Sequence, residues 1–73
     1  MTLINLKKNQ SAEEVTINFD NVTTMNVDGS KIYFYSVNGD FEIYTAANSD
    51  TAKQKYLEIL NQIIGEEKFI VLE

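Results

Sequence analysis

Three tyrosines, Tyr33, Tyr35 and Tyr44, are the side chains of this sequence whose types and spacing best fit a joint chemical role. They lie in two runs of alternating character, residues 31–37 and 40–45, which an Asn-Gly dipeptide joins. Tyrosine combines a large contact area with few rotatable bonds, and it is enriched at protein interfaces. If the three side chains share one face of a sheet, that face is a candidate surface for binding a protein.

Asn38-Gly39 is the element that must bring these tyrosines together. An Asn-Gly pair between alternating runs is a strong hairpin signal, because both central positions of a two-residue turn need φ > 0. As a two-residue loop, it pairs Tyr33 with Tyr44. The set of side chains then predicted to point outward is Tyr33, Tyr35, Val37, Glu42 and Tyr44. The set predicted to point toward the core is Ile32, Phe34, Phe41 and Ile43.

The outward set has two interpretations. In the first, the chain is a small protein-interaction module that binds a protein partner or a second copy of itself through this face or through an edge strand. In the second, the tyrosines only stabilise a half-exposed sheet, since each cross-strand aromatic pair contributes about 0.2–1 kcal/mol and scattered apolar residues are normal on a surface. The clustering of the three tyrosines with Val22 and Val37 keeps the binding interpretation open.

No group of side chains in the sequence indicates catalysis. His and Cys are both absent, and these residues supply most nucleophile–base pairs. The adjacent carboxylates Glu13-Glu14 and Glu66-Glu67 fall in polar connections, where charged residues are ordinarily exposed. We therefore expect a protein that is not an enzyme and that has no catalytic residue.

Motifs for metals and cofactors are not found either. Asp28-Gly29-Ser30 lacks the acidic spacing of a calcium loop, and Asp-Gly is favoured in hairpin turns for its backbone alone. The glycines Gly29, Gly39 and Gly65 do not form a phosphate-binding motif. The sequence therefore predicts no cofactor and no metal site.

The charge balance is acidic, with 11 Asp and Glu against 6 Lys and no Arg, a net charge of −5. This charge argues against direct binding to nucleic acid or to an anionic membrane, both of which select for basic patches. It leaves an alternative function open: an acidic inhibitor or nucleic-acid mimic encoded by a phage or mobile element. The residue bias, with much Asn, Ile and Lys, is typical of AT-rich bacterial or phage coding sequences.

The N-terminus has no charged region followed by a long apolar run, so we expect no signal peptide. No run approaches the roughly 18 apolar residues of a membrane-spanning helix. We therefore expect a cytoplasmic protein.

Periodicity predicts the elements that position these residues. Alternation predicts strands at residues 3–7, 15–19 and 22–27 before the hairpin. The period changes to 3.6 in a helix that starts near Ser49–Asp50 and ends at Gly65, where Gly takes the left-handed conformation. Residues 69–72 form a closing strand. We predict one domain, residues 1–73, of the α+β class: an antiparallel β-meander of four to five strands, one C-terminal helix packed on one face, and a short closing strand.

The predicted core joins one face of the sheet to one side of the helix. Its sheet residues are Ile4, Leu6, Val15, Ile17, Phe19, Met25, Val27, Ile32, Phe34, Phe41 and Ile43. Its helix residues form a broad apolar stripe: Ala52, Tyr56, Leu57, Ile59, Leu60, Ile63 and Ile64. Leu60 is predicted to be the central contact, so its truncation to Ala should cost about 2–5 kcal/mol.

Overall fold

The structure is a computed structural model that describes residues 1–7 and 14–73, and Glu13 of the first acidic pair lies outside them. Its elements are β1 (Leu3–Lys7), β2 (Glu14–Asn18), the 3-10 helix η1 (Phe19–Asn21), β3 (Val22–Asp28), β4 (Lys31–Ser36), β5 (Phe41–Thr45), α1 (Ser49–Ile64) and β6 (Phe69–Leu72). The chain is an α+β fold of mostly antiparallel strands with one helix and a closing strand, as predicted.

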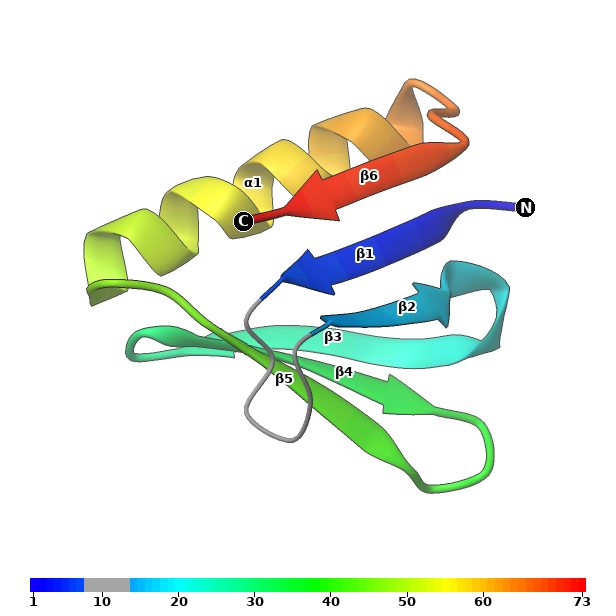
Figure 1. The fold of residues 1–73 in the computed structure, drawn as a ribbon, viewed down its shortest axis with the longest axis horizontal. Helices are drawn as coiled ribbons and strands as arrows, with labels where there is room; N and C mark the ends of the chain where they lie inside the picture. Colours follow the sequence, from blue (N-terminus) through cyan, green and yellow to red (C-terminus); the bar gives the residue numbers. More distant parts are fainter. Residues whose placement is uncertain (8–13) are drawn as a thin grey trace.

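The strands form two sheets rather than one continuous meander (Figure 1). The first sheet has the order β2-β1-β6, with β2 antiparallel and β6 parallel to β1. The second sheet is the antiparallel meander β3-β4-β5. The break comes at η1, which Asn18 caps by accepting a 3.0 Å hydrogen bond from the Asp20 amide. This turn redirects the chain from one sheet to the other.

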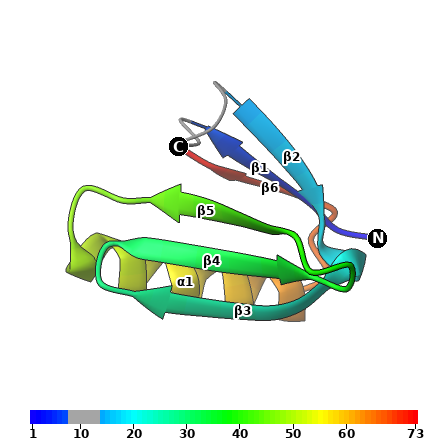
Figure 2. The ribbon, with the colours of Figure 1, turned by 90° about the horizontal axis from the view of Figure 1, so that it is seen from below.

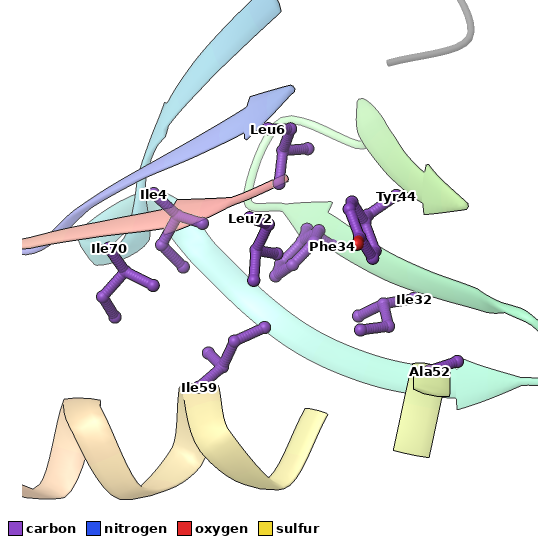
Figure 3. Packing of buried hydrophobic residues seen from close by; sticks show 9 residues of the cluster. All are labelled: Ile4, Leu6, Ile32, Phe34, Tyr44, Ala52, Ile59, Ile70 and Leu72. Atoms are coloured by element: carbon purple, nitrogen blue, oxygen red, sulfur yellow. The ribbon is translucent and has the colours of Figure 1, made fainter. Parts of the chain in front are cut away.

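The core lies between the two sheets, and α1 closes one side of it by contacting β3, β4 and β6 (Figure 3). Nine apolar side chains are buried there: Ile4, Leu6, Ile32, Phe34, Tyr44, Ala52, Ile59, Ile70 and Leu72. They come from both sheets and from the helix, so the core depends on contacts between segments far apart in sequence.

The ends of α1 agree with the prediction, but the left-handed residue does not. Asn48 caps the N-terminus by accepting a 2.8 Å hydrogen bond from the Thr51 amide. At the C-terminus Gly65 has an ordinary φ of −78°, and the positive φ of 61° belongs to Glu66. The Glu66 amide donates to the Ile63 carbonyl, and the following amide donates to the carbonyl of residue 62. This is a Schellman motif whose left-handed position holds Glu instead of Gly.

Replacing Glu66 by Gly should therefore stabilise the fold. The left-handed conformation costs a residue with a Cβ about 1–2 kcal/mol, and glycine avoids this cost. Part of the resulting gain in stability is lost, because unfolded glycine has a greater chain entropy. We expect the free energy of unfolding to rise by about 0.5–1 kcal/mol in urea denaturation. The control is Gly65→Ala, whose Cβ would lie 3.4 Å from the Asn61 carbonyl oxygen and 3.6 Å from the Gln62 carbonyl oxygen, which are ordinary contact distances. A destabilised Glu66→Gly variant would contradict the left-handed assignment.

The buried side of α1 is narrower than the sequence predicts. The helix residues that reach the core form the buried stripe: Ala52, Tyr56, Ile59 and Ile63. Leu57 and Ile64 are 59% and 80% exposed, and Leu60 is half-buried outside the core cluster. The prediction that Leu60 is the central contact is wrong, because Ile59 occupies that place. The helix packs along the opening between β3 and β6, so only the side chains that point into this opening are buried.

Candidate functional site

The turn between β4 and β5 has three residues, not the predicted two. The Ser36 amide donates to the Asp40 carbonyl at 2.8 Å, so Val37, Asn38 and Gly39 form the loop. The Gly39 amide donates to the Ser36 carbonyl at 3.0 Å, and Gly39 has a φ of 91°. This is the other common hairpin geometry, in which a turn is followed by a left-handed glycine bulge. The Asn-Gly pair therefore marks the hairpin correctly but sits one position later in the turn.

The longer loop shifts the register by one residue, and a one-residue shift moves a strand's side chains to the opposite face. Tyr44 lies opposite Ile32 instead of Tyr33, and its side chain is 4% exposed within the core. The predictions that Tyr44 points outward and that Phe41 and Ile43 belong to the core are wrong.

The register shift also moves Glu42 to the opposite face of the sheet, and Val37 lies in the turn instead of in a strand. Glu42 lies opposite the buried Phe34 and is half-buried, so it does not share the face of Tyr35 as predicted. Val37 is 70% exposed in the turn. Of the five residues predicted for the site, only Tyr33 and Tyr35 lie together on the outer side of the sheet.

The prediction for β4 itself is confirmed. Ile32 and Phe34 are buried, while Tyr33 and Tyr35 are half-buried on the other face. The reason is that β4 is the central strand of its sheet, and its alternation of aliphatic or Phe with Tyr matches one buried and one outer face.

The outer face of β3-β4-β5 carries a group of large side chains that we call the aromatic face: Tyr33, Tyr35, Phe41 and Ile43. The rings of Tyr33 and Tyr35 are stacked, with centroids 6.1 Å apart and planes 9° apart. The ring of Phe41 is tilted by 40° against Tyr35 at 5.8 Å. Figure 2 looks onto this side of the sheet, with α1 behind the strands and no other described element in front of them.

Polar residues border the aromatic face along β3. Thr24 and Asn26 lie opposite Tyr35 and Tyr33 in the strand register, and both are exposed. The face therefore has an apolar centre over β4 and β5 and a polar margin on β3. A centre of this kind with a polar rim is the usual composition of a protein-binding surface.

Two tyrosine hydroxyls hold the supporting sheet from its core side. The Tyr44 hydroxyl donates to the Glu73 carbonyl at 2.5 Å and joins β5 to the end of β6. The Tyr56 hydroxyl donates to the Met25 carbonyl at 3.3 Å and joins α1 to β3. These two hydrogen bonds join the strands that carry the aromatic face to the rest of the fold.

A cavity of about 370 Å³ lies where the chain passes from the end of β5 into the first turns of α1. Its charged lining residues are Lys7, Lys55 and Glu73. Lys7 forms an ion pair with Glu14, and the hydrogen bond from Lys7 lowers the pKa of the Glu14 carboxyl. Lys55 lies 3.8 Å from Glu58. Since both lysines already face carboxylates, this cavity does not offer an uncompensated positive charge to a ligand.

Comparisons with protein-family models, with curated proteins and with solved structures found no match to this chain. Within residues 1–7 and 14–73, no helix is long and apolar enough to cross a bilayer. In the same residues, no three acidic side chains gather closely enough to hold a metal ion.

Proposed function

We propose that this chain is a small, non-enzymatic protein-interaction module that binds a partner protein through the aromatic face. The observation that carries the proposal is the position of Phe41, which is 51% exposed beside Tyr33 and Tyr35 on a side of the sheet that α1 leaves open. Aromatic residues at the centre of such a face tend to dominate binding energy once a partner excludes water from them.

The alternative, that these rings only stabilise the sheet, explains Phe41 less well. A tyrosine on a half-exposed sheet keeps its hydroxyl in water, whereas phenylalanine exposes only apolar surface there. The chain has polar residues at the equivalent outer positions of β3, so the outer side of this sheet is not apolar throughout. A partner that covers Phe41 would remove its exposed surface from water, which is favourable in proportion to the area buried.

The charge of the chain limits the chemistry of the partner. The chain carries a net charge of −5, and Asp40 is exposed at the hairpin turn next to Phe41. Complementary charge steers association and suppresses incorrect partners. We therefore propose a partner surface with an apolar or aromatic centre and basic residues around it. The same charge supports a role without nucleic acid or membrane, and we propose that this role is cytoplasmic.

The test is a capture experiment from the cells that produce the protein. The immobilised wild-type chain is compared with a triple variant, Tyr33→Thr, Tyr35→Thr and Phe41→Thr, which removes the rings but keeps good strand formers. The matched control is Phe69→Thr with Val71→Thr, two exposed positions of β6 in the other sheet. We expect specific partners on the wild type and the control and none on the triple variant, with all three chains folded by circular dichroism.

Two outcomes would contradict the proposal. A folded triple variant that retains every partner would show that the aromatic face is not the binding surface. The acidic-inhibitor alternative, a nucleic-acid mimic from a phage or mobile element, would then take its place. A triple variant that unfolds would show that the rings serve the stability of the sheet.

A further inference from the structure

The Asn38-Gly39 pair carries a chemical reactivity besides its role in the turn, because the amide nitrogen of a following residue can attack an asparagine side chain. Glycine favours this attack, since it has no side chain to hinder the approach. Asn38 is the one asparagine of the sequence that precedes a glycine, and larger residues follow all the others. Both residues are exposed, and apart from its chain neighbours no described atom lies within 4 Å of where a Cβ on Gly39 would stand. Water and a solvent base therefore reach the pair.

We propose that Asn38 is the deamidation site of this chain and that the closed turn between β4 and β5 restrains the reaction. The Gly39 amide nitrogen loses its proton to a solvent base and attacks Asn38 Cγ. A bond forms between these two atoms, the bond from Cγ to Nδ2 breaks, and Nδ2 takes a proton from water and leaves as ammonia. Water then opens the resulting succinimide ring at either carbonyl carbon. Opening at Cγ gives aspartate, and opening at the main-chain carbonyl carbon gives isoaspartate, in which the chain runs through Cγ.

The closed turn holds the Asn38 main chain in a conformation that cannot form the ring. The Gly39 amide donates to the Ser36 carbonyl at 3.0 Å. Neither residue between them, Val37 or Asn38, has a positive φ, so the turn is of type I and Asn38 has a ψ of about 0°. The succinimide ring needs the Gly39 nitrogen to lie in one plane with Cα and Cβ of Asn38. This requires a large rotation of ψ, which the turn does not permit while it is closed.

Hydrogen bonds from the main chain and from the Asn38 side chain resist that rotation. The Ser36 amide donates to the Asp40 carbonyl at 2.8 Å, and the Val37 amide donates to the Asn21 carbonyl at 3.0 Å, which fixes the turn against η1. Asn38 Oδ1 accepts from the Asp40 amide at 3.2 Å, and Asn38 Nδ2 donates to Asp40 Oδ2 at 3.1 Å. Asn38 therefore reacts when the hairpin opens and is protected while the hairpin is closed.

Both products change the turn that positions the aromatic face. Each replaces the neutral amide by a carboxylate, in a chain of net charge −5 and next to the Asp40 carboxylate that now accepts from Nδ2. Like charges this close repel each other. The isoaspartyl product also adds a carbon atom to the main chain inside the three-residue turn, whose length directs Phe41 outward. Deamidation of Asn38 itself does not depend on the function proposed for the aromatic face.

The first test follows the full chain by peptide mapping with mass spectrometry, in native buffer and in guanidinium chloride concentrated enough to unfold it. We expect the exchange of NH2 for OH at Asn38 before any other asparagine. The reaction should be slower in native buffer by about tenfold or more, because the turn must first break at least two hydrogen bonds. Asn48, which is exposed and precedes Ser49, is the internal control. Earlier modification of another asparagine, or equal rates at Asn38 in the two buffers, would overturn the proposal.

The second test removes one of the hydrogen bonds that restrain Asn38. Asp40→Ala deletes the carboxylate that accepts from Nδ2. We expect the ratio of the native rate to the rate in denaturant to rise by about twofold to tenfold, the effect of one hydrogen bond. Asp40→Asn is the matched control, because its side-chain oxygen can still accept from Nδ2, and its ratio should stay near that of the wild type. An unchanged ratio in Asp40→Ala, or the same rise in both variants, would contradict the restraint.

The third test compares the separated products with the unmodified chain in urea denaturation. The isoaspartyl form should unfold at a lower urea concentration than the aspartyl form, because its altered main chain no longer fits the three-residue turn. The aspartyl form should in turn unfold below the unmodified chain, since it places a second carboxylate beside Asp40. Equal midpoints for the isoaspartyl form and the unmodified chain would show that the turn tolerates the modification and would overturn its proposed effect on the hairpin.

Discussion

Phe34→Ala should lower the free energy of unfolding by about 3–5 kcal/mol, the usual cost of truncating a buried phenylalanine. Phe34 is 1% exposed at the centre of the core, between both sheets (Figure 3). Its removal leaves a cavity that the surrounding strands cannot fill without losing their own contacts. Because small domains have only about 5–15 kcal/mol of stability in total, this variant should be largely unfolded at moderate urea concentrations.

Phe41→Ala is the matched control, because it removes the same side chain from the neighbouring strand. Phe41 is 51% exposed and contacts Tyr35, so its loss should cost no more than about 1 kcal/mol, the value of a cross-strand pair. Urea denaturation followed by circular dichroism measures both. Equal losses in the two variants would favour the two-residue loop, in which both phenylalanines would be buried.

Ile59→Ala should cost about 2–5 kcal/mol, whereas Leu60→Ala, one position along, should cost less than about 1 kcal/mol. Ile59 is fully buried, and Leu60 lies outside the core cluster. Ile59→Val, which removes one methyl group, should fall between them at about 0.5–1.5 kcal/mol. A larger loss for Leu60→Ala would mean that the helix is rotated relative to the sheets.

Local signals in the sequence predicted where α1 begins and ends. They cannot predict how many of its apolar side chains are buried. Asn48 and Gly65 act through hydrogen bonds within a few residues, so the sequence contains the information for where the helix begins and ends. Which side chains are covered depends on the opening between β3 and β6. That opening is formed by segments distant in sequence, and the apolar side chains of Leu57 and Ile64 are compatible with either outcome.

The division into two sheets was also beyond the sequence pattern. β2 and β3 alternate in the same manner whichever sheet they join, because alternation specifies faces and not neighbouring strands. The helical connection before β6 allows a parallel pair with β1, yet the periodicity of residues 69–72 does not say which strand they pair with. The prediction of class was correct because it depended on element types alone.

The candidate site shows the same division between local and tertiary information. The alternation of β4 placed Tyr33 and Tyr35 correctly. The face of the sheet on which Tyr44 and Phe41 lie depends on the length of the turn. Asn-Gly fits both a two-residue loop and a three-residue loop with a left-handed glycine. Tertiary contacts favour the second: the Tyr44 ring joins the core, and its hydroxyl reaches the Glu73 carbonyl.

Cross-strand nuclear Overhauser effects between α-protons of β4 and β5 test the central claim, that the three-residue turn makes the aromatic face. The backbone hydrogen bonds of Ser36 with Asp40 and of Ala46 with Ser30 leave the intervening non-hydrogen-bonded pairs closest together. The three-residue turn predicts strong contacts between Tyr33 and Ile43 and between Tyr35 and Phe41. Contacts that instead join Phe34 to Ile43 and Ser36 to Phe41, the non-hydrogen-bonded pairs of a two-residue loop, would restore the two-residue register and contradict the three-residue turn.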